Sequence, residues 1–305
     1  MKKALSKINF FQILIVCFVT FMWATCFPLI EMGHRAAPPL KFAAIRSLIA
    51  GSVILIPILF INRNWIKDKT FWKHSLYISI TFTVFGFGGM FLADSRVSPG
   101  IATVLANTQP LIAAVLCYFF LQEKMTTKNL IGLLISFSGI ILIASKSFSS
   151  DSLQGSFIGT LFILFGAFGT GAGNVFMKRA VKTYSPLVLT GVQFVLGAAI
   201  LFVASYFYEG NTSINWHPAF FWSLMILAVP GTAVSTVLWF MLLKKIQLNV
   251  LNIFSFLTPA FGILIGISFF NEKYTLLDFS GVLLALFGIY LATTSTKTEK
   301  YNVIT

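Results

Sequence analysis

Long apolar runs follow one another along this chain, and charged or turn-forming residues separate each run from the next. A helix needs about 20 apolar residues to cross the ~30 Å hydrocarbon layer of a bilayer. The pattern predicts ten such helices, which we expect at residues 10–30, 40–61, 75–93, 99–121, 128–146, 156–177, 185–207, 218–243, 248–270 and 276–294. The connectors are too short to fold as a water-soluble domain, so the pattern predicts an all-α integral membrane protein.

Composition indicates the same class of protein. Of the 305 residues, 57% are hydrophobic, 16% are aromatic and only 10% are charged, whereas soluble domains carry about 25% charged residues. The three cysteines all lie within apolar runs, where a thiol usually packs as a small hydrophobic group. We therefore expect no disulfide, no metal site and no cofactor.

The net charge of +13 raises the question of a nucleic-acid partner, but the basic residues are scattered singly and in pairs. Cytoplasmic loops of membrane proteins retain Lys and Arg. With the N-terminus inside, sixteen Lys and Arg residues fall in the inner segments and five in the outer ones. The charge therefore predicts cytoplasmic termini in a multi-pass protein of the plasma membrane (the bacterial inner membrane), with lipid rather than nucleic acid as its partner.

One segment occurs twice in the chain. Residues 110–145 align without gaps on residues 259–294, and the aligned pairs are Pro110 with Pro259, Glu123 with Glu272, Lys124 with Lys273, Gly132 with Gly281, and Gly139 with Gly288. Such residues are scarce in apolar spans, so the shared offset indicates a duplication, with repeats at 10–146 and 156–295. Earlier in the repeats, a looser alignment places Arg46 on Gln193.

Each predicted repeat has five helices, and five is an odd number. The second repeat must therefore enter the membrane from the side opposite to the first, which makes the two repeats inverted. Inverted repeats recur in secondary transporters, because two similar halves can exchange conformations around one central site and so open it to either side.

Three segments carry a resemblance to a known family. "WATCF" at 23–27 lies in the first span, "PPLKFAAIR" at 38–46 enters the second, and "SRVSPGIATVLANTQP" at 95–110 enters the fourth. Together with the ten spans and the duplication, they resemble the EamA branch of the drug/metabolite transporter superfamily. The resemblance implies an inner-membrane carrier of two EamA-type repeats, often an exporter of amino acids, amines or related small metabolites.

Polar and indole side chains within the spans are candidates for the substrate site, because polar groups are costly there unless they face a cavity or another helix. The mid-span prolines Pro110 and Pro259 are expected to kink spans four and nine and to free backbone acceptors near the midplane. We expect the site to be lined by Trp23, Asn107, Gln109, Trp239, Asn252 and Thr258. The alternatives are interhelical hydrogen bonds worth about 0.6 kcal/mol each and, for the indoles, packing against lipid.

Arg46 is the one charge well inside a span. It lies six residues from the outer end of span two, which is roughly 9 Å deep at about 1.5 Å per residue. It can form an outer ion-pair gate with Glu31 or Asp94, which end spans one and three, or it can anchor an anionic group of the substrate. Snorkelling of the guanidinium to the headgroups is the alternative.

Two further features concern the helix ends and breaks. Glu123 and Glu272 lie near the starts of spans five and ten, where the helix dipole favours a carboxylate, and binding of a coupling ion is the alternative. Pro230 and Gly231 predict a break in span eight, with no clear counterpart in span three.

The sequence offers no catalytic machinery, so we expect no enzyme. The three histidines fall in loops on different faces, and no phosphate-binding loop is present for ATP-driven transport. A non-transporting membrane scaffold or sensor, or a channel, is the alternative to a carrier, but a scaffold leaves the inverted duplication unexplained. We expect a small-molecule solute as ligand, and a homodimer is compatible with the sequence.

Overall fold

The fold is a bundle of ten helical spans, as the apolar pattern predicted. The computed structural model describes residues 9–34, 36–61, 67–94, 102, 105–123, 125–143, 157–270 and 275–294, and all regular structure within them is helical. Seven of these helices are long and apolar enough to cross a membrane. Three shorter apolar helices accompany them, at Gln109–Leu121, Thr127–Ile143 and Leu276–Ala292. The expected all-α membrane protein is thereby confirmed.

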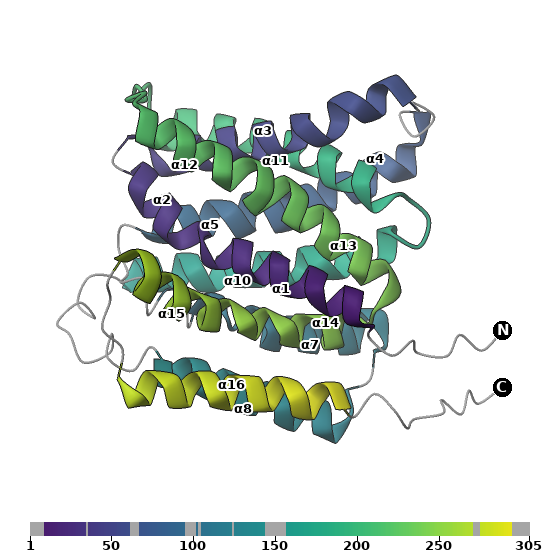
Figure 1. The fold of residues 1–305 in the computed structure, drawn as a ribbon. Helices are drawn as coiled ribbons and strands as arrows, with labels where there is room; N and C mark the ends of the chain where they lie inside the picture. The colour runs from purple at the N-terminus through teal and green to yellow at the C-terminus, as the bar shows by residue number, and fades with distance from the viewer. Residues whose placement is uncertain are drawn as a thin grey trace.

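Some spans are single helices and others are interrupted. The uninterrupted ones are α3 (Pro39–Ile61), α8 (Thr127–Ile143), α10 (Phe157–Ala180), α11 (Pro186–Glu209) and α16 (Leu276–Thr294), drawn in Figure 1. Span four is represented by α7 (Gln109–Leu121), which begins directly after a turn at residues 107–108.

Four spans consist of two or three helical segments. They are α1 (Phe10–Ala24) with α2 (Cys26–His34), α4 (Lys69–Ile78) with η2 (Ser79–Phe87) and α5 (Gly88–Asp94), α12 (Pro218–Ala228) with η4 (Val229–Val234) and α13 (Ser235–Lys245), and α14 (Leu248–Ile253) with η5 (Phe254–Phe256) and α15 (Leu257–Phe270).

The third span begins six residues earlier than the expected residue 75, because Asp68 caps α4. Its carboxylate accepts hydrogen bonds from the backbone N–H groups of Thr70 at 2.8 Å and of Phe71 at 3.3 Å. Such a cap satisfies N–H groups that have no partner in the first helical turn. A polar, basic first turn therefore joins the helix although it lies outside the apolar run.

The break in span eight is π-helical, and hydroxyl groups compensate for it. Pro230 has no N–H group to donate, and the Thr232 hydroxyl donates to the Leu227 carbonyl at 2.7 Å, while the Ser235 hydroxyl donates to the Pro230 carbonyl at 2.6 Å. Both bonds reach back five residues, which matches the wider turn of a π-helix.

Span three contains a second π-helical segment, η2, so the expectation that the Pro230 break has no counterpart there was wrong. The reason is the tertiary contact of this segment with α10. Segment η2 packs on a glycine-rich face of α10, where a Cβ built on Gly169 would lie 2.7 Å from the Thr81 carbonyl oxygen and one on Gly173 would lie 2.6 Å from the Phe82 Cβ. Glycines of span three take part in the same contact, since a Cβ built on Gly86 would lie 2.6 Å from the Thr170 hydroxyl oxygen and one on Gly89 would lie 2.5 Å from the Phe162 carbonyl oxygen.

The pairs α3 with α11 and α8 with α16 make the most extensive contacts between helices. In Figure 1, α8 and α16 form one edge of the bundle, α3 and α11 lie near the opposite edge, and α1 and α10 run between them. Helix α1 begins and α16 ends on the same side of the bundle.

Glycines bring α8 and α16 into backbone contact. A Cβ built on Gly132 would lie 2.5 Å from the Gly288 carbonyl oxygen, and one on Gly139 would lie 2.5 Å from that of Gly281. Between these contacts the Ser136 hydroxyl donates to the Ala285 carbonyl at 3.0 Å. Lipid tails are as apolar as leucine, so helices in a bilayer associate through this kind of close packing rather than through the hydrophobic effect.

Large apolar side chains cover the outside of the bundle. Phe60, Phe207 and Leu276 are each more than 80% exposed. A water-soluble protein rarely exposes extended apolar surface of this kind, so the surface suits a hydrocarbon environment.

We predict that Gly139→Ala destabilises the protein, because the added methyl group clashes with the backbone of α16. Overpacking of this type costs about 1–3 kcal/mol, which should lower the thermal unfolding midpoint in detergent by several degrees. Gly262→Ala is the matched control, since a Cβ there meets nothing within 4 Å. Equal midpoints for the two variants would contradict the close α8–α16 contact.

Candidate functional site

A cavity of about 150 Å³ lies in the middle of the bundle. Residues from spans one to four and from spans six, eight and nine line it: Trp23, Cys26, Ile30, Arg46, Phe82, Phe87, Met90, Phe91, Ala106, Asn107, Gln109, Thr170, Asn174, Gly231, Thr236, Trp239, Ser255 and Thr258. A cavity of this volume holds a molecule about the size of benzene. Both halves of the chain therefore contribute to one small binding site.

The interruptions of the helices supply much of this lining. Trp23 and Cys26 flank the break at Thr25, Asn107 lies in the turn before α7, and Ser255 lies in the 3₁₀ segment η5. Gly231 belongs to the π-helical η4. Irregular backbone within a membrane is tolerated where it lines a cavity or is buried in protein.

Two indole rings form one wall of the cavity. The rings of Trp23 and Trp239 lie 4.9 Å apart at an interplanar angle of 53°, within the range of favourable aromatic contact. The Trp239 Nε1–H donates to the Asn174 side-chain oxygen at 3.3 Å, which fixes the ring, and Trp239 is 1% exposed. This burial rules out the alternative that Trp239 packs against lipid.

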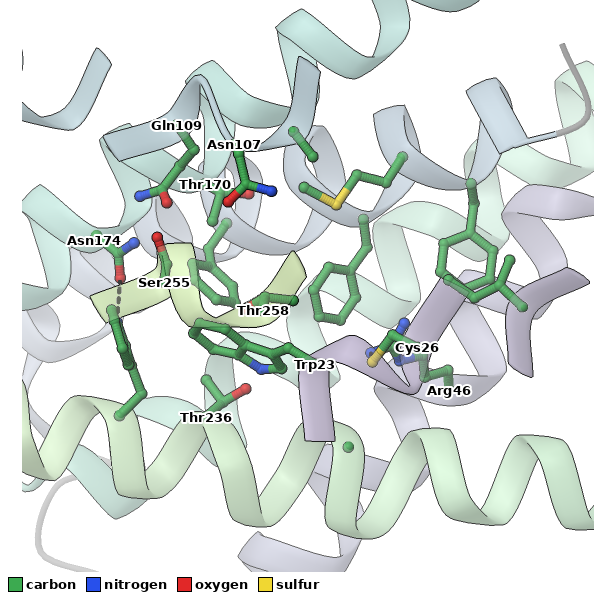
Figure 2. Close-up of a pocket in the computed structure, with 18 residues that line it drawn as sticks. Trp23, Cys26, Arg46, Asn107, Gln109, Thr170, Asn174, Thr236, Ser255 and Thr258 are labelled. Carbon is green, nitrogen blue, oxygen red and sulfur yellow. Dashed lines mark hydrogen bonds between the residues drawn. The ribbon is translucent and has the colours of Figure 1, made fainter. Parts of the chain in front are cut away.

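Amide and hydroxyl groups form the opposite wall. Figure 2 shows Asn107, Gln109 and Thr170 across the cavity from Trp23 and Thr236. Gln109 is 9% exposed, and its Nε2 has no hydrogen-bond partner among the described residues. A buried donor of this kind favours a ligand or water that accepts its hydrogen bond.

Five of the six side chains predicted for the substrate site lie on the cavity wall, and Asn252 does not. Asn252 is 1% exposed within α14, three residues before Ser255. Pro110 is the second residue of α7, and Pro259 is the third residue of α15, which follows the 3₁₀ segment η5.

Arg46 reaches the cavity from α3 and is only 5% exposed, so it does not snorkel to the headgroups. Its Nε donates to the Thr232 hydroxyl at 2.6 Å and its Nη2 to the Cys26 sulfur at 3.4 Å. The guanidinium also lies over the ring of Phe87, 4.7 Å from the centroid. The side chains of Glu31 and Asp94, the proposed partners of an ion-pair gate, lie outside the described residues.

Sequence reasoning missed several polar residues of the cavity, above all Asn174, Thr170 and Thr236. Asn174 follows a glycine-rich run in α10. A lone amide in an apolar span is itself a signal of an interior position, so Asn174 could have been found.

A polar layer lies one helical turn beyond the cavity residues Asn174 and Trp239. The Lys178 ammonium donates to the carbonyl groups of Leu243 and Ile246 at the end of α13. The Glu123 carboxylate accepts from the backbone N–H groups of Leu248 at 3.1 Å and Asn249 at 3.4 Å. Glu123 therefore caps α14, in the other half of the chain, rather than the start of α8.

The EamA-like transporter family model matches this chain over residues 10–145 and again over residues 157–294. The chain belongs to the EamA-like transporter family. The chain is similar to two proteins of Bacillus subtilis (strain 168), the uncharacterized transporters YvbV and YoaV. YvbV is 26% identical over 95% of this chain and 94% of its own length, and YoaV is 28% identical over 90% and 94%.

The name of a third relative indicates its function. The "Probable amino-acid metabolite efflux pump" of Escherichia coli (strain K12) is 26% identical over 90% of this chain and 91% of its own length. A solved crystal structure shares the fold with a TM-score of 0.77, at 18% identity, over 93% of this chain and 97% of that one. The expected membership of this transporter family is thus confirmed, and nothing in these relatives points to catalysis.

Glu123 should give the stability a pH dependence. Burial raises the pKa of Glu123, and Lys178 with the N–H groups of α14 opposes that rise. A carboxyl group whose folded-state pKa lies above its unfolded pKa contributes stability below the unfolded pKa, which is about 4.3 for Glu. This contribution is lost as the pH rises through the folded-state pKa. Relative to the wild type, Glu123→Gln should therefore gain in unfolding midpoint as the pH rises above about 4.3, the unfolded value.

The control for this measurement is Asp68→Asn, for which the sign is opposite. The hydrogen bond from the Tyr184 hydroxyl, helped by the N–H groups of α4, lowers the pKa of Asp68. The stability that Asp68 contributes is present above its unfolded pKa and is lost as the pH falls through its folded-state pKa. Parallel curves of unfolding midpoint against pH for the wild type and Glu123→Gln would show that the Glu123 carboxylate is not desolvated.

Proposed function

We propose that this protein is a secondary transporter that exports a small metabolite, an amino acid, an amine or a related compound, across the plasma membrane. The observation that supports this most directly is the cavity itself, which is small, lies between the two halves of the chain and combines indole rings with amide and hydroxyl groups. Ligand sites are typically apolar with a few placed polar groups. The amino-acid efflux pump named among the relatives supports the substrate class.

We further propose that residues 10–146 and 156–295 are inverted repeats that alternate around this cavity. The contact of α8 with α16 supports the relation. Gly132 meets Gly288, Gly139 meets Gly281, and Ser136 meets Ala285. In the alignment of the two repeats, Gly132 corresponds to Gly281, Gly139 to Gly288 and Ser136 to Ala285.

This correspondence has a geometric meaning. Exchanging each residue for its counterpart turns the first contact into the second and leaves the third unchanged, as a two-fold axis through an isologous interface requires. The two helices run antiparallel in register, so such an axis is perpendicular to them and lies in the plane of the membrane. That orientation is the one expected of inverted repeats.

The substrate contacts proposed are Trp23, Asn107, Gln109, Trp239 and Thr258, with Asn252 left out because it is away from the cavity wall. The rings suit an apolar part of the solute, and the amides and the hydroxyl suit its polar groups. A di-anionic phosphate ester does not suit this site, since Arg46 is the one cation among its lining residues.

Transport can be tested after comparing the metabolites released by cells with and without the gene, which identifies a solute for reconstituted vesicles. We expect saturable flux with counterflow. A scaffold has no flux, and a channel does not show counterflow.

Asn107→Ala should raise the half-saturating solute concentration about tenfold, as expected for the loss of one buried hydrogen bond. Asn129→Ala is the control, because this buried amide lies in α8 away from the cavity. Equal effects of both would mean that Asn107 only supports packing.

Inverted topology predicts that Lys124 lies inside and Lys273 outside, although both residues are counterparts in the alignment. After replacement of Cys17, Cys26 and Cys117, an impermeant thiol reagent should label Lys273→Cys in intact cells and Lys124→Cys only in inverted vesicles. Labelling of both from the same side would contradict both the inverted repeats and the cytoplasmic termini.

A further inference from the structure

Arg46 is the one charged residue among those that line the cavity. It is 5% exposed, and the described groups around it are the Thr232 hydroxyl, the Cys26 sulfur and the rings of Phe87 and Phe91. A hydroxyl, a thiol and a ring face each solvate a cation in part, but none carries a full negative charge. The cavity therefore holds an uncompensated positive charge among the side chains that the structure describes.

The position related to Arg46 in the other half shows that the fold itself does not need this charge. Gln193 follows Arg46 by 147 residues in the looser alignment, and Thr232 follows Thr83 by 149 residues, which is the offset of the alignment without gaps. The Thr83 hydroxyl donates to the Gln193 side-chain oxygen at 2.7 Å, and both residues are fully buried. An uncharged amide thus contacts a threonine of the π-helical segment η2 as Arg46 contacts one of η4, although the Thr83 hydroxyl donates to Gln193 and the Thr232 hydroxyl accepts from Arg46.

The two related positions differ in one respect that bears on function. Arg46 is on the cavity wall, whereas Gln193 is not among its lining residues. Charge is costly within a membrane protein and is retained where it has a partner or a role. The charged member of the pair is therefore found at the position that faces the ligand.

We propose that Arg46 binds the carboxylate of the transported solute, so that the substrate is a small carboxylic acid or amino acid and not an amine. This inference rests on the proposed transport function and narrows its substrate class. A guanidinium has five N–H groups, and the bonds to Thr232 and Cys26 occupy two of them. The remaining three suit one carboxylate, for which the planar guanidinium is well matched.

The remainder of the cavity accounts for the rest of the solute. Its volume of about 150 Å³ and the indole rings of Trp23 and Trp239 suit an apolar side chain of moderate size. The fixed bonds to Thr232 and Cys26 hold the guanidinium in place before the solute arrives, which lowers the ordering cost of binding.

The test uses binding rather than transport, so that it stands apart from the flux experiment. Four solutes of similar size are compared by their effect on the unfolding midpoint of the purified protein: leucine, 4-methylpentanoate, leucinamide and 3-methylbutylamine. We expect the two carboxylates to bind at least about tenfold more tightly than the amide and the amine, as for hydrogen bonds to a charged group.

Variants assign this preference to one side chain. Arg46→Gln should abolish the preference for carboxylates while leaving a folded protein, because glutamine occupies the related position 193. Arg46→Lys should retain a weakened preference, since it keeps the charge but loses the planar donor pair. Gln193→Met is the matched control away from the cavity and should leave the preference unchanged.

Three results would overturn the proposal. The first is a wild-type protein that binds neither carboxylate or binds the amide and the amine equally well, and the second is an unchanged preference in Arg46→Gln. The third is recovery of the carboxylate preference in Arg46→Gln when Glu31→Gln or Asp94→Asn is added, which would mean that Arg46 balances a carboxylate of the protein. Carboxylate binding without any saturable flux would instead leave Arg46 standing as the carboxylate-binding residue and refute the transport function.

Discussion

Backbone N–H and C=O groups inside a bilayer have no water to bond, so every departure from a regular helix must be compensated within the protein. In this chain the departures gather around one cavity, at Thr25, at the turn before α7, and in η2, η4 and η5. The hydroxyls of Thr232 and Ser235 make up for the bonds disturbed near Pro230. The same requirement that keeps the other spans regular therefore concentrates irregular, polar structure in the interior.

Helices that take no part in the cavity have a different role. Neither α8 nor α16 contributes to its lining, and their glycines bring the two backbones into direct contact. A contact of backbone on backbone leaves little freedom for sliding, so this pair suits a fixed connection between the two halves. The interrupted helices, by contrast, carry Trp23, Asn107 and Ser255 and contain the segments with irregular hydrogen bonding.

Charge is used sparingly in the interior, and its placement separates two functions. Lys178 and Glu123 satisfy the backbone groups at the ends of α13 and α14, one turn beyond the cavity. Arg46 lies in the cavity with neutral described partners. In a medium of low dielectric constant, a cation with only dipolar partners attracts an anion strongly, which supports the proposed role of Arg46 as the carboxylate-binding residue.

Membrane insertion and the number of spans could be predicted from the sequence alone, because apolar length acts locally and needs no partner. The class of function followed from the duplication and the family resemblance. The cavity residues Trp23, Asn107, Gln109, Trp239 and Thr258 were also within reach, since polar and indole groups inside a span have few places to go. Asn252 shows the limit of that rule, because it is buried but is not among the residues that line the cavity.

Other features were decided only by tertiary structure. The π-helical form of η2 arises against the glycines of α10, and Glu123 caps a helix that begins 125 residues later. Arg46 turned inward because Thr232 and Cys26, from two other spans, receive its N–H groups. Each of these outcomes depends on atoms far apart in the chain, and a pattern read along one helix carries no information about which neighbour that helix will meet.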